Sequence, residues 1–212
     1  MKVCCIQSVD EAWMAIEAGA SALGLVSEMP SGPGVITDDQ AAQIAAAVPP
    51  GVDAFLLTSL PSVEAIVQQN REIKARALQL VDALPTGAHA ELRRALPGVK
   101  LVQVVHVVGP ESLDEAIRLA PEVDAILLDS GNPALEVKQL GGTGRRHDWE
   151  ISRRIREAID APLFLAGGLR PGNVHEAIDT VGPFGLDVCS GLRPGPDFAL
   201  DAGLLERFMA AA

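Results

Sequence analysis

The stretch AILLDSGNPALEVKQLGGTGRRHDWEISRRIREAI, Ala125–Ile159, contains one complete unit of the pattern that decides the fold. It begins with a short apolar run ending at Asp129, which has the length and composition of a buried strand. It ends with Asp148–Ile159, an amphipathic segment that opens with a residue favoured at helix N-termini. Between them, three glycines surround Thr143. Glycine clusters cost conformational entropy on folding, so this connection is either a hinge or a cradle for a group that approaches the main chain closely.

Short apolar runs and longer amphipathic segments alternate along the whole chain. The candidate strands are Lys2–Ile6, Ala22–Val26, Ala54–Thr58, Ala77–Val81, Lys100–Val107, Val123–Asp129, Pro162–Ala166 and Gly185–Cys189. The candidate helices are Ser8–Ala20, Thr37–Val48, Ser62–Ile73, Ala88–Leu96, Ser112–Ala120, Asp148–Ile159, Asn173–Val181 and Asp201–Ala211.

This alternation predicts parallel strands joined by right-handed crossovers. An open, doubly wound α/β sheet and a closed barrel both satisfy it. Eight repeats with a helix after the last strand favour a single (β/α)8 TIM barrel domain over residues 1–212. In such a barrel the chemistry lies in the loops that follow the strands.

Composition restricts the partners. Of 212 residues, 48% are hydrophobic and only 3% aromatic, so alanine and aliphatic side chains must build the core. The net charge is −11, and no Lys- or Arg-rich run occurs, so we expect no nucleic-acid partner. An anionic ligand would have to be held by local donors against this charge.

The beginning of the chain does not resemble a signal peptide, and no apolar stretch is long enough to cross a bilayer. We therefore expect a cytoplasmic protein without membrane contacts. Its three cysteines show neither a disulfide framework nor zinc spacing, so reduced thiols are expected. No ligand cluster suggests a metal or organic cofactor, and we expect none.

Three glycine-bearing turns follow the last three candidate strands. Glycine lets several N–H groups point at one anion, and the loops after the last strands are a frequent phosphate site in such barrels. Each turn alone could simply connect a strand to a helix, but three on one side favour a phosphate cradle. The residues predicted to form it are Gly141, Gly142, Thr143, Gly144, Gly167, Gly168, Ser190 and Gly191.

Six ordered segments resemble the phosphoribosylanthranilate isomerase family. They are KVCCI at Lys2, EAGASALGLV at Glu17, ILLD at Ile126, GGTGRRHDW at Gly141, PLFLAGGLRPGNV at Pro162 and GLDVCSGLRPGPD at Gly185. The resemblance implies an aldose–ketose isomerisation, the Amadori rearrangement of a phosphoribosyl amine in tryptophan biosynthesis. It requires one general acid and one general base on opposite sides of the sugar.

The resemblance assigns the base to Cys4 and the acid to Asp129. Position alone favours an inert buried thiol at Cys4, and a helix cap or turn former is the alternative to the acid role at Asp129. A polar, partly electropositive barrel mouth would favour the Cys4 thiolate. Asp129 must have a raised pKa to donate a proton near neutrality. Strand alternation places Cys5 on the opposite face, packed against helices.

The chain departs from the family after the second strand. Its loop reads SEMPSGPGVI, Ser27–Ile36, and Gly34 falls on the position of the family's Arg, which helps to engage the anthranilate portion. Glu28 adds a negative charge to this loop, which would weaken recognition of a carboxylate. The side chains expected to contact the substrate instead are Gln79, Asp82, Gln103, His106 and Arg193.

Three functions remain open at this point. The chain is an isomerase of phosphoribosylanthranilate, an isomerase of another phosphorylated aminosugar, or a relative that binds a phosphorylated metabolite without turnover. The presence of both Cys4 and Asp129 argues against the last, since a binding protein needs no acid–base pair. We expect a phosphorylated small molecule as the partner, and a monomer or homodimer.

Overall fold

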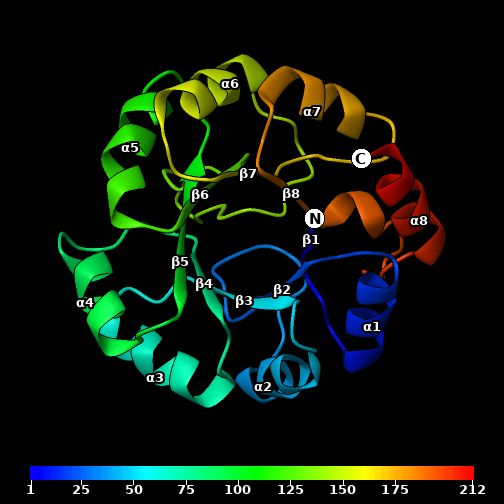
Figure 1. Ribbon diagram of the computed structural model, residues 1–212, viewed down its shortest axis with the longest axis horizontal. Helices are drawn as coiled ribbons and strands as arrows, with labels where there is room; N and C mark the ends of the chain where they lie inside the picture. Colours follow the sequence, from blue (N-terminus) through cyan, green and yellow to red (C-terminus); the bar gives the residue numbers. More distant parts are fainter.

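Eight parallel strands form a closed barrel in which each strand pairs with its neighbours in the chain and β8 returns to β1 (Figure 1). The computed structural model describes residues 1–212. The strands are β1 (Lys2–Val3), β2 (Ala22–Val26), β3 (Asp53–Thr58), β4 (Ala77–Leu80), β5 (Lys100–His106), β6 (Ala125–Asp129), β7 (Leu163–Leu165) and β8 (Gly185–Val188). The predicted (β/α)8 barrel is confirmed, and the pairing of β1 with β8 excludes the open sheet.

One α-helix follows each strand, and the eight helices surround the barrel (Figure 1). They are α1 (Val9–Glu17), α2 (Asp38–Ala47), α3 (Val63–Ile73), α4 (Ala88–Ala95), α5 (Ser112–Leu119), α6 (Trp149–Ala158), α7 (Val174–Val181) and α8 (Ala202–Ala211). Two short 3₁₀ helices, η1 (Ala120–Glu122) and η2 (Ser190–Leu192), follow α5 and β8.

Side-chain caps set the starts of five helices. Ser8, Thr37, Ser62, Asp148 and Asp201 each accept a hydrogen bond from a backbone N–H in the first turn, which satisfies a donor that the helix itself leaves unpaired. The longest helix has 11 residues, about half the length that a membrane span requires.

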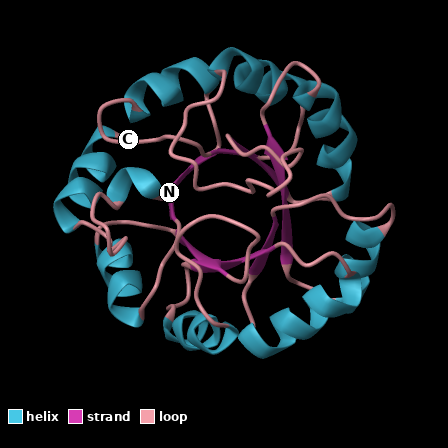
Figure 2. Cartoon of the chain, turned by 180° about the vertical axis from the view of Figure 1, so that it is seen from behind, coloured by secondary structure: helices cyan, strands magenta, loops and turns pink.

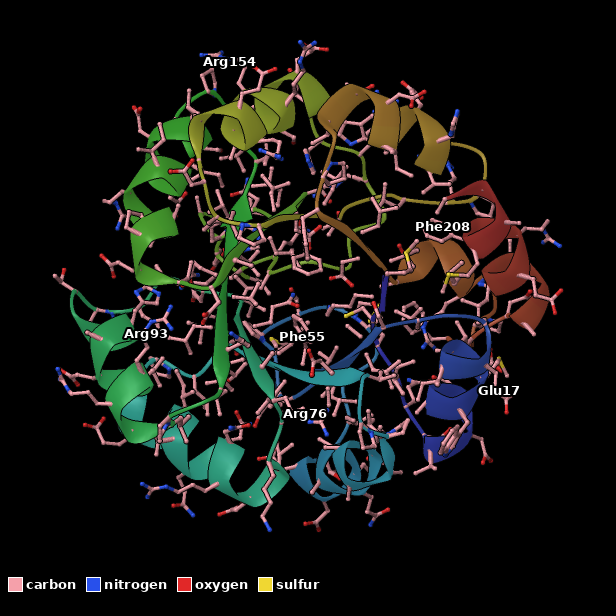
Figure 3. The ribbon with its side chains drawn as sticks, in the orientation of Figure 1. Glu17, Phe55, Arg76, Arg93, Arg154 and Phe208 are labelled. Atoms are coloured by element: carbon pink, nitrogen blue, oxygen red, sulfur yellow. A yellow bond between two sulfur atoms is a disulfide. The ribbon has the colours of Figure 1, made fainter.

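Strand alternation divides the core into two layers. The larger cluster, of 44 buried residues, lies between strands and helices, and a second cluster of 14 fills the barrel interior. In β5, Val102 and Val104 belong to the interior and Leu101 and Val105 to the outer layer. Figure 3 shows Phe55 inside the ring of strands and Phe208 on α8, directed at the outer layer.

The first strand is much shorter than the predicted Lys2–Ile6. Its β pairing ends at Val3, and Cys5 adopts a left-handed backbone conformation with φ of 61°. This conformation breaks the alternation of side chains, so Cys5 does not face the helices as expected. It forms a disulfide with Cys189, with the two Cα atoms 6.0 Å apart. The expectation of three reduced thiols was therefore wrong for two of the cysteines, and Cys4 is the one free thiol.

The disulfide predicts a measurable stability difference. It joins residues separated by 184 positions, so it constrains almost the entire unfolded chain. Reduction, or the variant Cys5→Ala, should lower the free energy of unfolding by roughly 3–5 kcal/mol. Urea denaturation with and without reductant measures this. In denaturant, thiol titration should find one thiol before reduction and three after it; three before reduction would contradict the pairing.

Candidate active site

A cavity lies at the carboxyl ends of the strands, and the loops that line it cross the middle of the barrel (Figure 2). Its wall contains both Cys4, at the end of β1, and Asp129, at the end of β6. The thiol and carboxyl group that the sequence paired thus face the same space. The remaining wall comes mainly from the loops after β2, β6, β7 and β8.

The Cys4 thiol is buried, with 4% of the residue exposed. Burial raises its pKa to about 11, and the nearby Lys2 ammonium works against this shift. The sequence-based expectation of a thiolate-favouring mouth is therefore only partly met. The positive group is present, but removal from water outweighs it, so the resting thiol is protonated at neutral pH.

Asp129 meets the requirement for a raised pKa. Burial raises the pKa of its carboxyl group, although Oδ1 accepts a 2.7 Å hydrogen bond from the Ser130 amide and His106 lies nearby. A carboxyl group that keeps its proton to higher pH is suited to donate one.

Asp187 is a second carboxyl group in the cavity wall and was not among the predicted site residues. Only 6% of the residue is exposed; Oδ2 lies 2.8 Å from Lys2 Nζ, whereas Oδ1 has no hydrogen-bond partner. The signal was a charged residue in the middle of the strand segment GLDV, because a carboxylate inside a barrel needs a partner or a ligand.

The three glycine-bearing loops converge on one side of the cavity. The N–H groups of Gly142, Gly144, Gly167 and Gly168 donate no hydrogen bond within the protein, so they are available to an acceptor. The 3₁₀ helix η2 begins at Ser190 beside them, in the arrangement that binds phosphate in many barrels of this fold.

All but one of the predicted cradle residues line the cavity. The exception is Gly191, whose backbone packs against the Leu169 carbonyl, so its role is to let two loops approach closely. Thr143 ties the first loop to the end of β6 through a 2.6 Å hydrogen bond with Ser130 Oγ.

Of the five expected substrate contacts, only Gln79 lies in this cavity. Its side chain is buried and Oε1 has no partner, so a ligand hydroxyl or amine can donate to it. Asp82, Gln103 and His106 line a separate groove beside α4 and α5. Asp82 forms an ion pair with Lys138 there.

The expectation was wrong for Gln103 because strand alternation directs it away from the barrel interior. Its Oε1 lies 2.9 Å from His89 Nε2, and its amide nitrogen donates to the Leu80 carbonyl. His106 Nε2 lies 2.9 Å from the Val81 carbonyl oxygen, as expected for an ordinary histidine at a strand end.

Arg193 is not available to a substrate either. Its side chain is 0% exposed, and its guanidinium lies 2.9 Å from Glu11 Oε2 and donates to the Phe198 carbonyl. An internal carboxylate therefore neutralises it, and it fastens α1 to the segment after β8.

The divergent loop after β2 closes one side of the cavity. Met29, Ser31 and Pro33 line it, and Ser31 Oγ donates a 2.6 Å hydrogen bond to the Lys138 carbonyl in the loop after β6. No lysine, arginine or histidine lines the cavity. Any anionic part of a ligand must therefore be held by main-chain and hydroxyl donors, or lie at the rim.

The class of protein follows from this geometry. A thiol and a carboxyl group line one cavity at the carboxyl ends of the strands, and a cluster of free main-chain amides lies beside them. These are the features of a (β/α)8-barrel acid–base enzyme for a phosphorylated small molecule.

Comparison with known proteins identifies the family. The model for N-(5'-phosphoribosyl)anthranilate isomerase matches residues 1–194, so the chain belongs to this family. The Halobacterium salinarum N-(5'-phosphoribosyl)anthranilate isomerase is 37% identical over 217 aligned residues, covering 100% of this chain and 94% of the relative. N-(5'-phosphoribosyl)anthranilate isomerase 2 of Methanosarcina mazei is 36% identical, with 93% and 87% covered.

Solved structures of this family have the same fold as the chain. Phosphoribosyl anthranilate isomerase from Thermotoga maritima superposes with a TM-score of 0.85 at 28% identity, covering 100% of this chain and 97% of the other. A phosphoribosyl anthranilate isomerase in complex with reduced 1-(o-carboxyphenylamino)-1-deoxyribulose 5-phosphate gives 0.82 at 26% identity, with 100% and 96% covered.

A buried histidine at the end of the connection between β6 and α6 predicts acid sensitivity. Burial lowers the pKa of His147 to about 4 from an ordinary 6.5, and its Nδ1 has no partner. The unfolded chain therefore binds more protons below pH 6.5, so stability is lost as the pH falls toward 4. The loss should reach roughly 2–3 kcal/mol at pH 4.5. Urea titrations of wild type and His147→Phe at pH 7 and 4.5 test this; equal losses in both would refute it.

Proposed function

We propose that the chain isomerises N-(5'-phosphoribosyl)anthranilate to the corresponding 1-deoxyribulose 5-phosphate by general acid–base catalysis. The observation that carries the proposal is that Cys4 and Asp129 line one cavity whose remaining wall presents free main-chain amides. The chain's membership of the family supplies the reaction class.

Each step can be given to a group in the cavity. Asp129 donates its proton to the furanose ring oxygen, the C1'–O bond breaks, and the nitrogen lone pair forms a protonated Schiff base. The Cys4 thiolate then removes the C2' proton, the C–H electrons form the C1'–C2' double bond, and the C=N π electrons return to the nitrogen, which gives an enolamine. Tautomerisation of this enol gives the C2' ketone. No redox partner is needed, since hydrogen only moves within the substrate and the protein.

The protonation state that catalysis requires of Cys4 is the opposite of its resting state. Catalysis needs Asp129 protonated and Cys4 deprotonated, whereas burial raises the pKa of Cys4 to about 11 and also raises that of Asp129. Only a minor fraction of the protein carries this arrangement. A group that favours the Cys4 thiolate therefore increases the active fraction directly.

The rest of the cavity orients the sugar. The free amides of the loops after β6 and β7 hold the phosphate, so a chain of net charge −11 still binds an anion. Gln79 Oε1 and Asp187 Oδ1 are unpaired acceptors in the wall, and we assign them to the sugar hydroxyls.

A tryptophan auxotroph that lacks this isomerase tests the proposal. Expression of the wild-type chain should restore growth, while Cys4→Ala and Asp129→Ala should not. The purified variants should lose turnover but bind a phosphorylated product analogue within roughly tenfold of wild type, because the cradle is unchanged. Circular dichroism controls for folding. Failure of soluble wild-type protein to complement, or variants that retain turnover, would contradict the proposal.

A second candidate is an isomerase whose substrate has an uncharged group in place of anthranilate. The observation that favours it is the absence of any lysine, arginine or histidine from the cavity wall. Position 34 cannot supply a cation either. Gly34 has φ of 78°, and a Cβ added there would lie 2.6 Å from Cys5 Cβ.

The contact between Cys5 and Gly34 makes a prediction about this specificity. Gly34→Arg alone should destabilise the protein, because its Cβ would overlap the Cys5 side chain. Cys5→Gly should relieve the overlap and also suits the left-handed backbone at position 5. The double variant should recover stability relative to the sum of the single changes and lower KM for the anthranilate substrate by about tenfold or more. Additive melting-temperature changes would contradict the coupling.

We infer that the partner is a phosphorylated small molecule and that the chain acts as a monomer or homodimer, without nucleic acid, membrane or cofactor. Among similar structures is one described as mutually generated monomers of the dimeric Thermotoga maritima enzyme. We infer a cytoplasmic location from the proposed biosynthetic role, and the Cys5–Cys189 pair would meet reducing conditions there.

A further inference from the structure

A lysine, Lys2, lies inside the barrel close to Cys4. Lys2 is 0% exposed, and its Nζ lies 2.8 Å from Asp187 Oδ2 and 5.6 Å from the centroid of the Phe55 ring. Figure 3 shows Phe55 inside the ring of strands. The ammonium group is thus in the barrel interior, on the same side of β1 as Cys4.

Glycine at position 24 makes room for this arrangement. A Cβ added to Gly24 would lie 2.5 Å from Cys4 Sγ and 3.0 Å from Lys2 Nζ, so both groups converge on the space that a side chain would otherwise fill. The pairing of β1 with β2 and β8 fixes Lys2 between Ala22 and Asp187. The thiol, ammonium and carboxylate are therefore neighbours.

Stability alone gives a weak reason for this ion pair. Desolvating two charges costs several kcal/mol, and well-packed apolar side chains often replace a buried ion pair without loss. The ammonium group interacts with two anionic groups. One is the Asp187 carboxylate, and the other is Cys4 when it is a thiolate. Burial opposes the charged form of Lys2, but Asp187 and Cys4 together raise the pKa of Lys2, so it keeps its charge.

We propose that Lys2 is a positioning residue for Cys4, holding and stabilising the thiolate that removes the C2' proton, with Asp187 as its counterion. The role rests on the proposed function, but its physical content, a dependence of the Cys4 thiolate on Lys2, does not. Lys2 keeps its three protons throughout. The C2'–H bond breaks, the S–H bond forms, and the proton that the thiolate accepts comes only from the substrate.

The two partners act on Cys4 with opposite signs. The positive charge of Lys2 favours the thiolate, whereas the negative charge of Asp187 disfavours it. Removing each should therefore move the reactivity of Cys4 in opposite directions. A purely structural ion pair would not produce this difference, since both variants would then disturb the interior in the same way.

The rate of alkylation of Cys4 by iodoacetamide at pH 8 to 9 measures the thiolate fraction, because the thiolate is the reacting species. In non-reduced protein Cys4 is the one free thiol, and peptide mapping identifies the alkylated residue. We expect Lys2→Met to be alkylated about tenfold more slowly than wild type and Asp187→Asn several-fold faster. The double variant Lys2→Met/Asp187→Asn, which has no unpaired buried charge, should lie between them.

Lys100→Met is the matched control, since Lys100 begins β5, is 66% exposed and also pairs with an aspartate. It should be alkylated at the wild-type rate. Melting temperatures identify any variant that fails to fold. If Lys2→Met does, the double variant is compared with Asp187→Asn, from which it differs only at residue 2: slower alkylation of the double variant is expected, and an equal rate would overturn the proposal. Lys2→Met alkylated at the wild-type rate in folded protein would overturn the proposal, as would Lys2→Met and Asp187→Asn shifting in the same direction.

Turnover provides the second readout. Lys2→Met should lower kcat at pH 7 about tenfold with KM within roughly threefold, and Lys2→Arg, which keeps the positive charge, should recover part of the rate. An unchanged kcat in folded Lys2→Met, or a loss that Lys2→Arg does not relieve at all, would overturn the role in catalysis. If wild type does not turn over phosphoribosylanthranilate, the proposed function fails, while alkylation still decides whether Lys2 controls the thiolate.

Discussion

The closure of the barrel between β1 and β8 is the constraint on which the site depends. This seam has two register pairs, Lys2 with Asp187 and Val3 with Val188. It is nevertheless the seam that carries the thiol, the second carboxylate and the start of the phosphate loop. The Lys2–Asp187 ion pair and the disulfide that follows it in the chain add cross-links between these two strands, whose ladder has only two register pairs. Closure and chemistry therefore rely on the same few residues.

A strongly acidic chain binds an anion here by separating global from local charge. Acidic residues outnumber basic ones by 28 to 17, and two carboxyl groups line the cavity itself. Main-chain amides supply local positive potential without a side-chain charge, and they do so on the side formed by the last strands. The acid and base occupy the space next to them. The sugar can then lie between the groups that react and the groups that hold its phosphate.

The alternation of apolar and amphipathic segments predicted all eight strands and all eight α-helices, because each unit repeats the same signal, and the count of eight units favoured the closed barrel over the open sheet. The same alternation failed at Cys5, where one left-handed residue changes the direction of the side chain. Alternation does account for Gln103: the valines on either side of it face the interior, so its own side chain faces outward. Arg193 could not be assigned from sequence, since its partner Glu11 is 182 residues away. The sequence does not single out Lys2 and Asp187, because each is one charged residue within a short, otherwise apolar run.

The position of the disulfide links specificity to the base. Cys5 follows Cys4 directly, and its side chain fills the space beside Gly34 while bonding to Cys189 in front of the phosphate loop. The residue that excludes a side chain from position 34 is therefore the one that fixes the backbone after the thiol. A change of the wall that contacts the aglycone would therefore also change the backbone that positions Cys4, because Cys5 belongs to both. Exchange of a glycine and a larger residue between positions 5 and 34 is the smallest change that would preserve the packing of this wall.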